Sequence, residues 1–268
     1  LKKPIEDLTK LFNKLRKDKK FIKERDYYFK NYVGTPTSFI KLYNTSHQLG
    51  GAQINAKVVS EANGGAHKIY NAIVHALICK HAGKKYIIGD TGAGYAGKML
   101  SMAAKKFGLK CKIFMGTKDM ARQKPNCDAI RANGAEIIPV DSGSKTLVDA
   151  VSECMRYWVS NCDTTHMCVG STVGPNIFVK ICAWSTAQIS RELILQIKKE
   201  FAASANATKA AGAKAYLLHQ FEFYGLQTPE RRSICKAFYK TYPVTSHATL
   251  VTIIKEAFAA PERELHYF

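Results

Sequence analysis

The chain has 268 residues, which suits one large domain or two smaller ones, and its 46 % of hydrophobic residues is the composition expected of an ordinary soluble protein. No apolar run approaches the roughly 20 residues that a helix needs to cross a bilayer, which excludes a membrane span. The net charge of +19 is typical of nucleic-acid-associated proteins, but the lysines are scattered in sequence without an aromatic-interleaved stripe, so we favour solvated basic faces over a nucleic-acid partner.

The first third of the chain combines helical periodicity with a short strand. Apolar residues recur at helical spacing over residues 4–32, and a break follows at Tyr32-Val33-Gly34-Thr35-Pro36-Thr37. Residues 54–59 have the composition of a strand.

From Gly64-Gly65 onward, short strands alternate with longer helices. A helix is predicted from this turn to about Ala82, with Ile69, Ile73, Leu77 and Ile78 on its apolar face. The remaining predictions are strands at 86–89, 111–115, 135–140 and 167–170 and helices at 97–108, 126–133 and 146–160. This alternation predicts an α/β fold with a parallel sheet, whose ligands gather at the carboxyl ends of strands. Asp90 and the loop after Gly170 lie at such ends.

The character of the sequence changes after about residue 200. Residues 202–215 are alanine-rich and indicate a helix or connector, and residues 216–268 show helical periodicity at Ile234 and Phe238 and at Leu250, Ile253, Ile254 and Phe258. We predict a mainly helical tail over 201–268, without a strand-turn-helix unit.

Eight cysteines stand within apolar or amphipathic segments, and none has the CxxC spacing: Cys79, Cys111, Cys127, Cys154, Cys162, Cys168, Cys182 and Cys235. Free cysteine in such a setting behaves as a small hydrophobic residue. We predict a reducing, cytoplasmic location without a disulfide framework or a zinc site.

The first chemical candidate is Lys68, which follows a Gly-Gly turn and opens an apolar helix. An amine held against an apolar face is desolvated and can act as a nucleophile. Most lysines are surface residues, so this position alone leaves both interpretations open, and His67 alone is a weaker signal still.

A second candidate is the loop Thr91-Gly92-Ala93-Gly94, between a strand and a helix. Backbone N–H groups at such a place bind anions, although a tight turn also needs glycine. The loop lacks the complete G-x-G-x-x-G pattern with its distant acidic partner, so we rank a nicotinamide enzyme low.

Together these motifs resemble the β chain of tryptophan synthase, a pyridoxal-phosphate enzyme of the fold-type-II class. The family's HTGAHK corresponds to Gly64-Gly65-Ala66-His67-Lys68, and its AETGAGQHG to the stretch from Gly89 to Gly97. Its MGAxDVxRQ, GAEVxPVxSGSxTL and GSxxGP motifs have counterparts in Met115–Gln123, Gly134–Leu147 and Gly170–Pro175. The resemblance covers residues 5–200 in unbroken order.

The resemblance implies a function and a set of site residues. Pyridoxal 5'-phosphate is expected to attach to Lys68, with His67, Gly170 and Ser171 also binding the cofactor. Lys68 is then the base for the α-proton of L-serine, and Asp90 takes the place of the family's catalytic glutamate. The loop of Thr91, Gly92, Ala93, Gly94 and Tyr95 is expected to hold the substrate carboxylate, and indole then replaces the serine hydroxyl to give tryptophan.

The sequence also departs from the family. Asp90 is shorter than glutamate by one C–C bond, about 1.5 Å, and a misplacement of ~1 Å can cost about a hundredfold in rate. Tyr95-Ala96 replaces Gln-His, the family's RED motif is changed near Glu61, and residues 201–268 contain no GGGSN-like phosphate loop. Val148 stands where the family has a lysine facing its α partner, which weakens the expectation of an αβ complex.

We therefore predict three-layer parallel-sheet domains of the fold-type-II class, with the second domain incomplete. Residues 1–200 form the enzyme region, including a smaller mobile subdomain at about 83–170. The expected partners are L-serine, indole and a second copy of the chain, with no membrane partner and no metal. The alternatives are a catalytically dead relative, a basic nucleic-acid-associated protein on an enzyme scaffold, and another fold-type-II enzyme such as a serine or threonine dehydratase.

Overall fold

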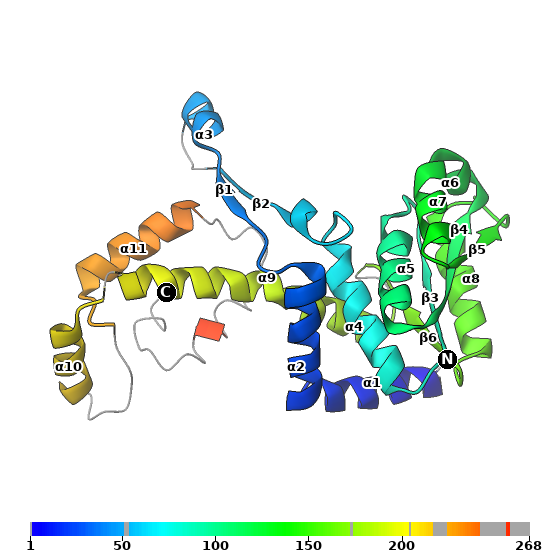
Figure 1. The fold of residues 1–268 in the computed structure, drawn as a ribbon, viewed down its shortest axis with the longest axis horizontal. Coiled ribbons are helices and arrows are strands. Elements are labelled where there is room, and N and C mark those ends of the chain that lie inside the picture. Colours follow the sequence, from blue (N-terminus) through cyan, green and yellow to red (C-terminus); the bar gives the residue numbers. More distant parts are fainter. Residues whose placement is uncertain are drawn as a thin grey trace. The chain divides into compact units, whose positions relative to one another are not determined.

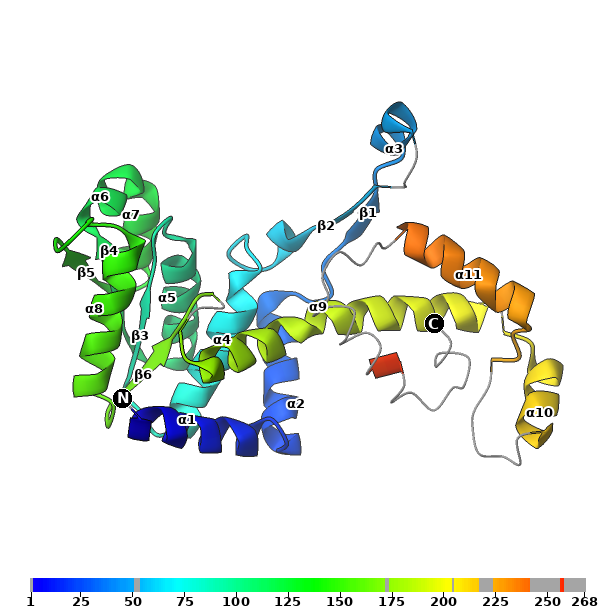
Figure 2. The same ribbon diagram turned by 180° about the vertical axis from the view of Figure 1, so that it is seen from behind.

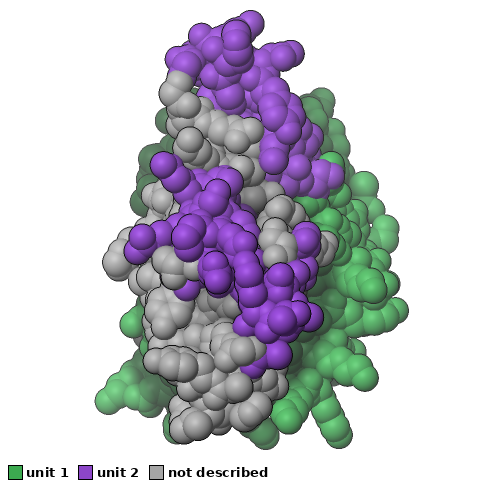
Figure 3. Space-filling model, turned by 90° about the vertical axis from the view of Figure 1, so that its left-hand side faces the viewer, with its two compact units in different colours: residues 1–37, 59–186 green, residues 38–58, 187–268 purple. Residues whose placement is uncertain are grey.

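The computed structural model describes residues 2–50, 54–171, 174–203, 205–216, 224–241 and 256–257. It divides into two compact units, which Figure 3 colours separately. Unit 1 comprises residues 1–37 and 59–186, and unit 2 comprises residues 38–58 and 187–268. The predicted division at residue 200 and the predicted subdomain at 83–170 stay predictions.

The elements are labelled in Figure 1. The helices are α1 (Lys2–Leu15), α2 (Lys19–Tyr28), the π-helical turn η1 (Phe29–Val33), α3 (Tyr43–Leu49), the 3-10 turn η2 (Val59–Glu61), α4 (Lys68–His81), α5 (Tyr95–Phe107), α6 (Thr117–Arg122), α7 (Lys124–Ala132), α8 (Leu147–Ser160), α9 (Asn176–Ala203), α10 (Ala207–Tyr216) and α11 (Thr228–Thr241). The strands are β1 (Phe39–Lys41), β2 (Asn55–Lys57), β3 (Tyr86–Asp90), β4 (Lys110–Gly116), β5 (Glu136–Val140) and β6 (Thr165–Cys168).

A parallel sheet with the strand order β5-β4-β3-β6 forms the centre of unit 1. Helices α5 and α7 connect β3, β4 and β5 in one direction, and α8 returns the chain across the sheet to β6. Because such crossovers are right-handed, α8 covers the face opposite to α5 and α7. The two ribbon views agree, with α5 and α8 on opposite sides of the sheet (Figures 1 and 2). The predicted three-layer parallel arrangement is confirmed for this unit.

Helix α4 is the core helix of unit 1. Every residue from Ile69 to Cys79 is buried, so the helix is enclosed on all sides rather than along one stripe. It packs mainly against α5 and also contacts β6, β3 and α2. The predicted apolar face is therefore buried, and the rest of the helix is buried with it.

The cysteines of this unit behave as the small hydrophobic residues that the sequence predicts. Cys79, Cys111, Cys127, Cys154 and Cys168 are buried. Burial raises the pKa of Cys79 and of Cys111 to about 12, so both stay protonated near neutral pH.

Several elements differ from the sequence prediction, because β1, α3 and α6 were not predicted and two further elements differ in extent. The last strand spans Thr165–Cys168, two residues earlier than predicted, because Thr165 and His166 pair with Tyr86 and Ile87 although both side chains are polar. Both polar residues are buried, which a strand prediction from apolar residues misses. The shift places Gly170 in the loop after the strand. The long helix Asn176–Ala203 was not predicted as one element.

In unit 2, β1 and β2 pair antiparallel, with Ile40 opposite Ala56, and the predicted strand at 54–59 is confirmed as β2. The predicted helical positions Ile234 and Phe238 lie in α11. Leu250, Ile253, Ile254 and Phe258 lie outside the described residues.

Among the helices of the described ranges, none combines the length and apolar character that crossing a bilayer requires.

Candidate active site

The order of the strands locates a binding crevice. The crossovers run one way from β3 to β5 and the other way to β6, so the strand order reverses between β3 and β6. At such a reversal the loops leave the carboxyl ends in opposite directions and open a crevice between them. Asp90 is the last residue of β3, and Gly170 follows β6 by two residues.

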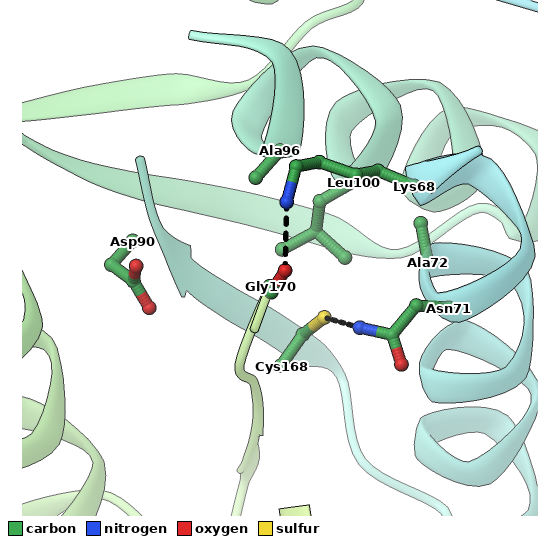
Figure 4. Close-up of a pocket in the computed structure, with 8 residues that line it drawn as sticks. All are labelled: Lys68, Asn71, Ala72, Asp90, Ala96, Leu100, Cys168 and Gly170. Carbon is green, nitrogen blue, oxygen red and sulfur yellow. Dashed lines mark hydrogen bonds between the residues drawn. The ribbon is translucent and has the colours of Figure 1, made fainter. Parts of the chain in front are cut away.

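Lys68 reaches into this crevice from the first position of α4. Its Nζ donates a hydrogen bond of 2.9 Å to the carbonyl oxygen of Gly170, and the side chain is half-buried (Figure 4). The turn before it is tight: Gly64 has φ +90°, and a Cβ there would lie 2.5 Å from Sδ of Met99 on α5. The glycine therefore lets the start of α4 approach α5, and the amine is directed at the end of β6.

Asp90 contributes a carboxyl group to the same pocket (Figure 4). The residue is 7 % exposed, and its Oδ1 has no hydrogen-bond partner among the described residues. Burial raises the pKa of Asp90 to about 6, opposed by its backbone N–H and by the charge of Lys68. The carboxyl group can therefore exchange a proton close to neutral pH.

The pocket is narrow and partly open to solvent. Besides Lys68, Asp90 and Gly170, its lining comprises Asn71, Ala72, Ala96, Leu100 and Cys168. These five residues were not among the site residues predicted from the sequence. Helical spacing offered a signal, because Asn71 and Ala72 follow the lysine by one turn and Leu100 follows Ala96 by one turn.

Asn71 connects three elements behind the lysine. Its Nδ2 donates to the carbonyl oxygen of Val169 at 2.9 Å, and its Oδ1 accepts from the Ser185 hydroxyl of α9 at 3.2 Å. The residue is only 4 % exposed. Because Val169 precedes Gly170, Asn71 holds the backbone segment whose next carbonyl accepts from Lys68.

The predicted anion loop borders the pocket without lining it. Thr91 is buried and its N–H donates to the Phe114 carbonyl at 3.0 Å, while Tyr95 is 46 % exposed. The Ala93 carbonyl accepts from Asn126 Nδ2 at 2.8 Å. None of the residues from Thr91 to Tyr95, Gly92 and Gly94 included, belongs to the pocket lining, although both neighbours, Asp90 and Ala96, do.

His67 and Ser171 lie at the surface beside Lys68 and Gly170 respectively. Partial desolvation and the charge of Lys68 lower the pKa of His67, which favours its neutral form. Neither residue lines the pocket, and their predicted roles in cofactor binding stay predictions.

The pyridoxal-phosphate dependent enzyme family matches residues 31–266. The chain belongs to this family. The match extends beyond residue 200, into the segment for which the sequence suggested no family motif. The resemblance seen in the lysine and glycine motifs is thereby confirmed at the level of the family.

Within the family, the chain is similar to tryptophan synthase β chains. It is 41 % identical to that of Acinetobacter calcoaceticus over 196 residues, which are 73 % of this chain and 49 % of the relative. It is 42 % identical to that of Leptospira biflexa serovar Patoc over 199 residues, 74 % of this chain and 50 % of the relative. The matched part thus spans about half the length of these relatives.

Solved structures support the fold. Diaminopropionate ammonia lyase of Escherichia coli superposes with a TM-score of 0.54 at 19 % identity, over 66 % of this chain and 52 % of that one. A pyridoxal 5'-phosphate-dependent aspartate racemase gives 0.52 at 18 % identity, over 65 % and 50 %. At these identities the similarity concerns the fold alone, and it confirms the fold-type-II class that the sequence predicts.

The residues of the pocket fit the family's cofactor at its aldehyde end. A half-buried amine, the group that binds an aldehyde covalently, lies in the same hollow as a buried carboxyl oxygen without a partner in the described part of the chain. The backbone at Gly170 approaches so closely that a Cβ there would lie 3.0 Å from that of Ala96. Lys68 would hold the cofactor, next to the backbone of Gly170.

Proposed function

We propose that the chain catalyses a tryptophan synthase β-type reaction, in which indole replaces the hydroxyl of L-serine to give L-tryptophan and water. The observation that carries the proposal is the common pocket of the Lys68 amine and the Asp90 carboxyl at the point where the strand order reverses. The identity of about 41–42 % with tryptophan synthase β chains supports this choice of substrates.

Pyridoxal 5'-phosphate, when bound, supplies the electron sink that stabilises negative charge at the substrate's α-carbon. Lys68 would hold it, and the free amine of this lysine would remove the α-proton of serine. The hydrogen bond to the Gly170 carbonyl keeps this amine at the carboxyl end of β6.

Asp90 is proposed to give a proton to the β-hydroxyl of serine as it leaves as water. A poor leaving group needs this proton, and a carboxyl with a pKa of about 6 supplies it near neutral pH. The stretch Thr91–Tyr95 is proposed to receive the substrate carboxylate, and His67 and Ser171 the phosphate end of the cofactor.

The proposal includes a cytoplasmic protein that acts as a homodimer. An α-subunit partner has less support. Val148 on α8 is 71 % exposed and so available to a partner, but it lacks the charge that the family's lysine brings to that contact.

Tryptophan formation from serine and indole tests the proposal. The purified protein loaded with pyridoxal 5'-phosphate should form tryptophan, and Lys68→Ala should not. Lys118→Ala, which removes an exposed lysine of α6 outside the pocket, should match the wild type. Asp90→Asn should lower the rate by about 10²–10⁴, the usual contribution of a general acid or base.

Two results would count against the proposed reaction. Equal tryptophan formation by Lys68→Ala would remove the lysine from the chemistry. A wild-type protein that binds the cofactor at Lys68 but forms no tryptophan would favour the catalytically dead relative instead.

A further inference from the structure

At the amino ends of the central strands, opposite to the pocket, lysines gather from α4, α5, β4 and the turn before β3. We propose that this surface of unit 1 binds single-stranded nucleic acid. The basic face, as we call it, consists of Lys80 of α4, Lys85 before β3, Lys105 and Lys106 of α5, and Lys110 at the start of β4, all exposed. They lie at the amino ends of β3 and β4, whereas the pocket lies at the carboxyl ends, so the inference is independent of the proposed enzyme activity.

The lysines form one contiguous surface. The backbone N–H of Lys110 donates to the carbonyl of Lys85 at 3.1 Å, which places the starts of β3 and β4 side by side. Lys105 and Lys106 belong to the last turn of α5, which ends at Phe107, three residues before Lys110. The sequence hides this arrangement, because Lys80 and Lys110 are far apart in the chain and only the fold brings their elements together.

Aromatic rings alternate with these lysines. The ammonium of Lys110 lies 5.5 Å from the ring centre of Tyr86, and that of Lys106 lies 5.3 Å from Tyr32. Surfaces that bind single-stranded nucleic acid combine cationic side chains with aromatic rings in this way.

The aromatic part of the surface continues onto α2. Lys80 lies 5.9 Å from the ring centre of Phe107, which meets Tyr28 at 4.7 Å, and Tyr28 in turn contacts Tyr27 at 5.4 Å. Tyr27 is 60 % exposed, so its ring is available for a base to stack on.

Carboxylates compensate little of this charge. In the described part of the chain, Lys85, Lys105, Lys106 and Lys110 form no ion pair, and Lys80 shares Glu24 with His81. Asp163 stands at the margin, next to the Thr164 carbonyl that accepts from the backbone of Lys85.

Lysines at helix ends also have a purely structural explanation, because they offset the helix dipole. Lys80 and Lys105–Lys106 occupy the last turns of α4 and α5. Each helix end carries only about half a negative charge, so two ends and Glu24 offset about two of the five positive charges. The remaining positive charge, together with the exposed ring of Tyr27, favours a ligand that carries both phosphates and aromatic bases.

The test is binding of a fluorescein-labelled oligothymidylate to the whole chain, followed by anisotropy at several salt concentrations. The logarithm of the affinity should fall linearly with the logarithm of salt, with a slope of up to about −3.5 if all five lysines contact phosphates. The triple variant Lys105→Gln, Lys106→Gln and Lys110→Gln should flatten this slope by about 2 and lower the affinity at low salt by at least about tenfold.

A matched control separates the face from net charge alone. Lys10→Gln, Lys14→Gln and Lys17→Gln remove the same charge from exposed positions in and just after α1, and Lys14 also stands in a last helical turn. This control should bind like the wild type. Equal weakening by both triple variants would overturn the proposal.

The aromatic contribution has its own test. Tyr27→Ala should weaken binding about fivefold or more, because a stacked base contributes on the order of 1–3 kcal/mol. Binding of duplex DNA with the same affinity as the single strand, or no effect of Tyr27→Ala, would contradict recognition of single strands. Absence of any binding at low salt would overturn the proposal altogether.

Discussion

Among single residues, Asp90 shows the clearest conflict between local stability and proposed chemistry. Its carboxyl lies almost fully buried at the end of β3, with one oxygen lacking a partner in the described structure. Such a group disfavours its own ionisation, so the folded protein binds the proton more tightly than the unfolded chain does. The site therefore keeps a group that weakens the fold near neutral pH, as functional sites often do.

Asp90→Asn should stabilise the protein at pH 8 but not at pH 4. The pKa of Asp90 is raised from 3.8 to about 6, so its contribution to stability is fully present below about pH 4 and is lost as the pH rises through 6. This difference between the pKa values of the unfolded and folded states corresponds to as much as about 3 kcal/mol in the free energy of unfolding. Urea unfolding of both proteins at the two pH values measures it, and an equal effect at both would show that ionisation of Asp90 does not oppose folding.

Asn71 is expected to position the site rather than only to fill the core. Asn71→Ala removes the donor to the buried Val169 carbonyl at a cost of about 1–3 kcal/mol in stability, whereas the Ser185 hydroxyl keeps its bond to the Cys182 carbonyl. It should also weaken binding of pyridoxal 5'-phosphate, because the segment ending in Gly170 loses its anchor. Ser185→Ala leaves the bond to the Val169 carbonyl in place and should have a smaller effect on both.

Urea unfolding and titration of the cofactor, followed by fluorescence, give the two readouts. If Asn71→Ala is destabilised yet binds the cofactor with wild-type affinity, the residue supports the core and does not position the site.

The next scale is the packing of elements around the carboxyl ends of the strands. Gly116 closes β4 with φ −62°, a conformation that any residue can adopt. A Cβ at this position would nevertheless lie 2.1 Å from the carbonyl oxygen of Lys145. The glycine is required for the close approach of two backbones, because neither can move aside as a flexible side chain can.

Gly116→Ala should therefore destabilise unit 1 by more than Gly83→Ala. Gly83 has φ +67° but open space where a Cβ would lie, so alanine there should cost only the backbone strain of about 1–2 kcal/mol. Overpacking at Gly116 should cost about 1–3 kcal/mol or more and disturb the loop before α8. Thermal and urea unfolding of both variants decide between them, and a neutral Gly116→Ala would contradict the packing described.

Elements with strong periodicity and turn signals could be predicted from the sequence. Helix α4 and strands β3, β4 and β5 occur within a few residues of the predicted bounds. The predicted bounds of strand β6 were two residues too late because Thr165 and His166, which are buried in it, are polar. Helix α9 was not predicted as one element because its sequence has no clear amphipathic stripe. These are cases where tertiary packing, not local composition, decides the structure.

The same reasoning applies to the candidate site. Lys68, Asp90 and Gly170 could be predicted from motifs, and the structure brings all three to one pocket. Helical spacing alone pointed to Asn71, and Cys168 could not be predicted, because its contact with Asn71 depends on where α4 crosses β6. The basic face is hidden in sequence for the same reason.

For the whole molecule, we expect acid stability to depend on a buried histidine pair between α4 and β6. His75 Nδ1 lies 2.9 Å from His166 Nε2, and both residues are buried. Burial lowers the pKa of His75 to about 3, and burial together with His75 lowers the pKa of His166. Both rings are therefore neutral in the folded protein and can gain protons on unfolding.

The free energy of unfolding should fall as the pH drops from about 6.5 toward 3, because the two histidines bind protons in the unfolded chain but not in the folded protein. Each histidine contributes a slope of up to about 1.4 kcal/mol per pH unit, partly opposed by Asp90 between about pH 6 and 4. His75→Gln should reduce by about one the number of protons taken up on unfolding, and so make the plot of unfolding free energy against pH less steep. Unfolding free energies measured between pH 4 and 7 test this, and identical slopes for both proteins would refute the role of the pair.

The proposed function rests on Lys68 as the residue to which the chain attaches pyridoxal 5'-phosphate. Its most direct test is reduction of the cofactor-loaded protein with borohydride, followed by peptide mass mapping. We predict a single modified peptide that carries the cofactor mass on Lys68 and is absent in Lys68→Ala, with the same yield in Lys118→Ala as in the wild type. Label spread over several surface lysines, and unchanged in Lys68→Ala, would contradict the account of the site.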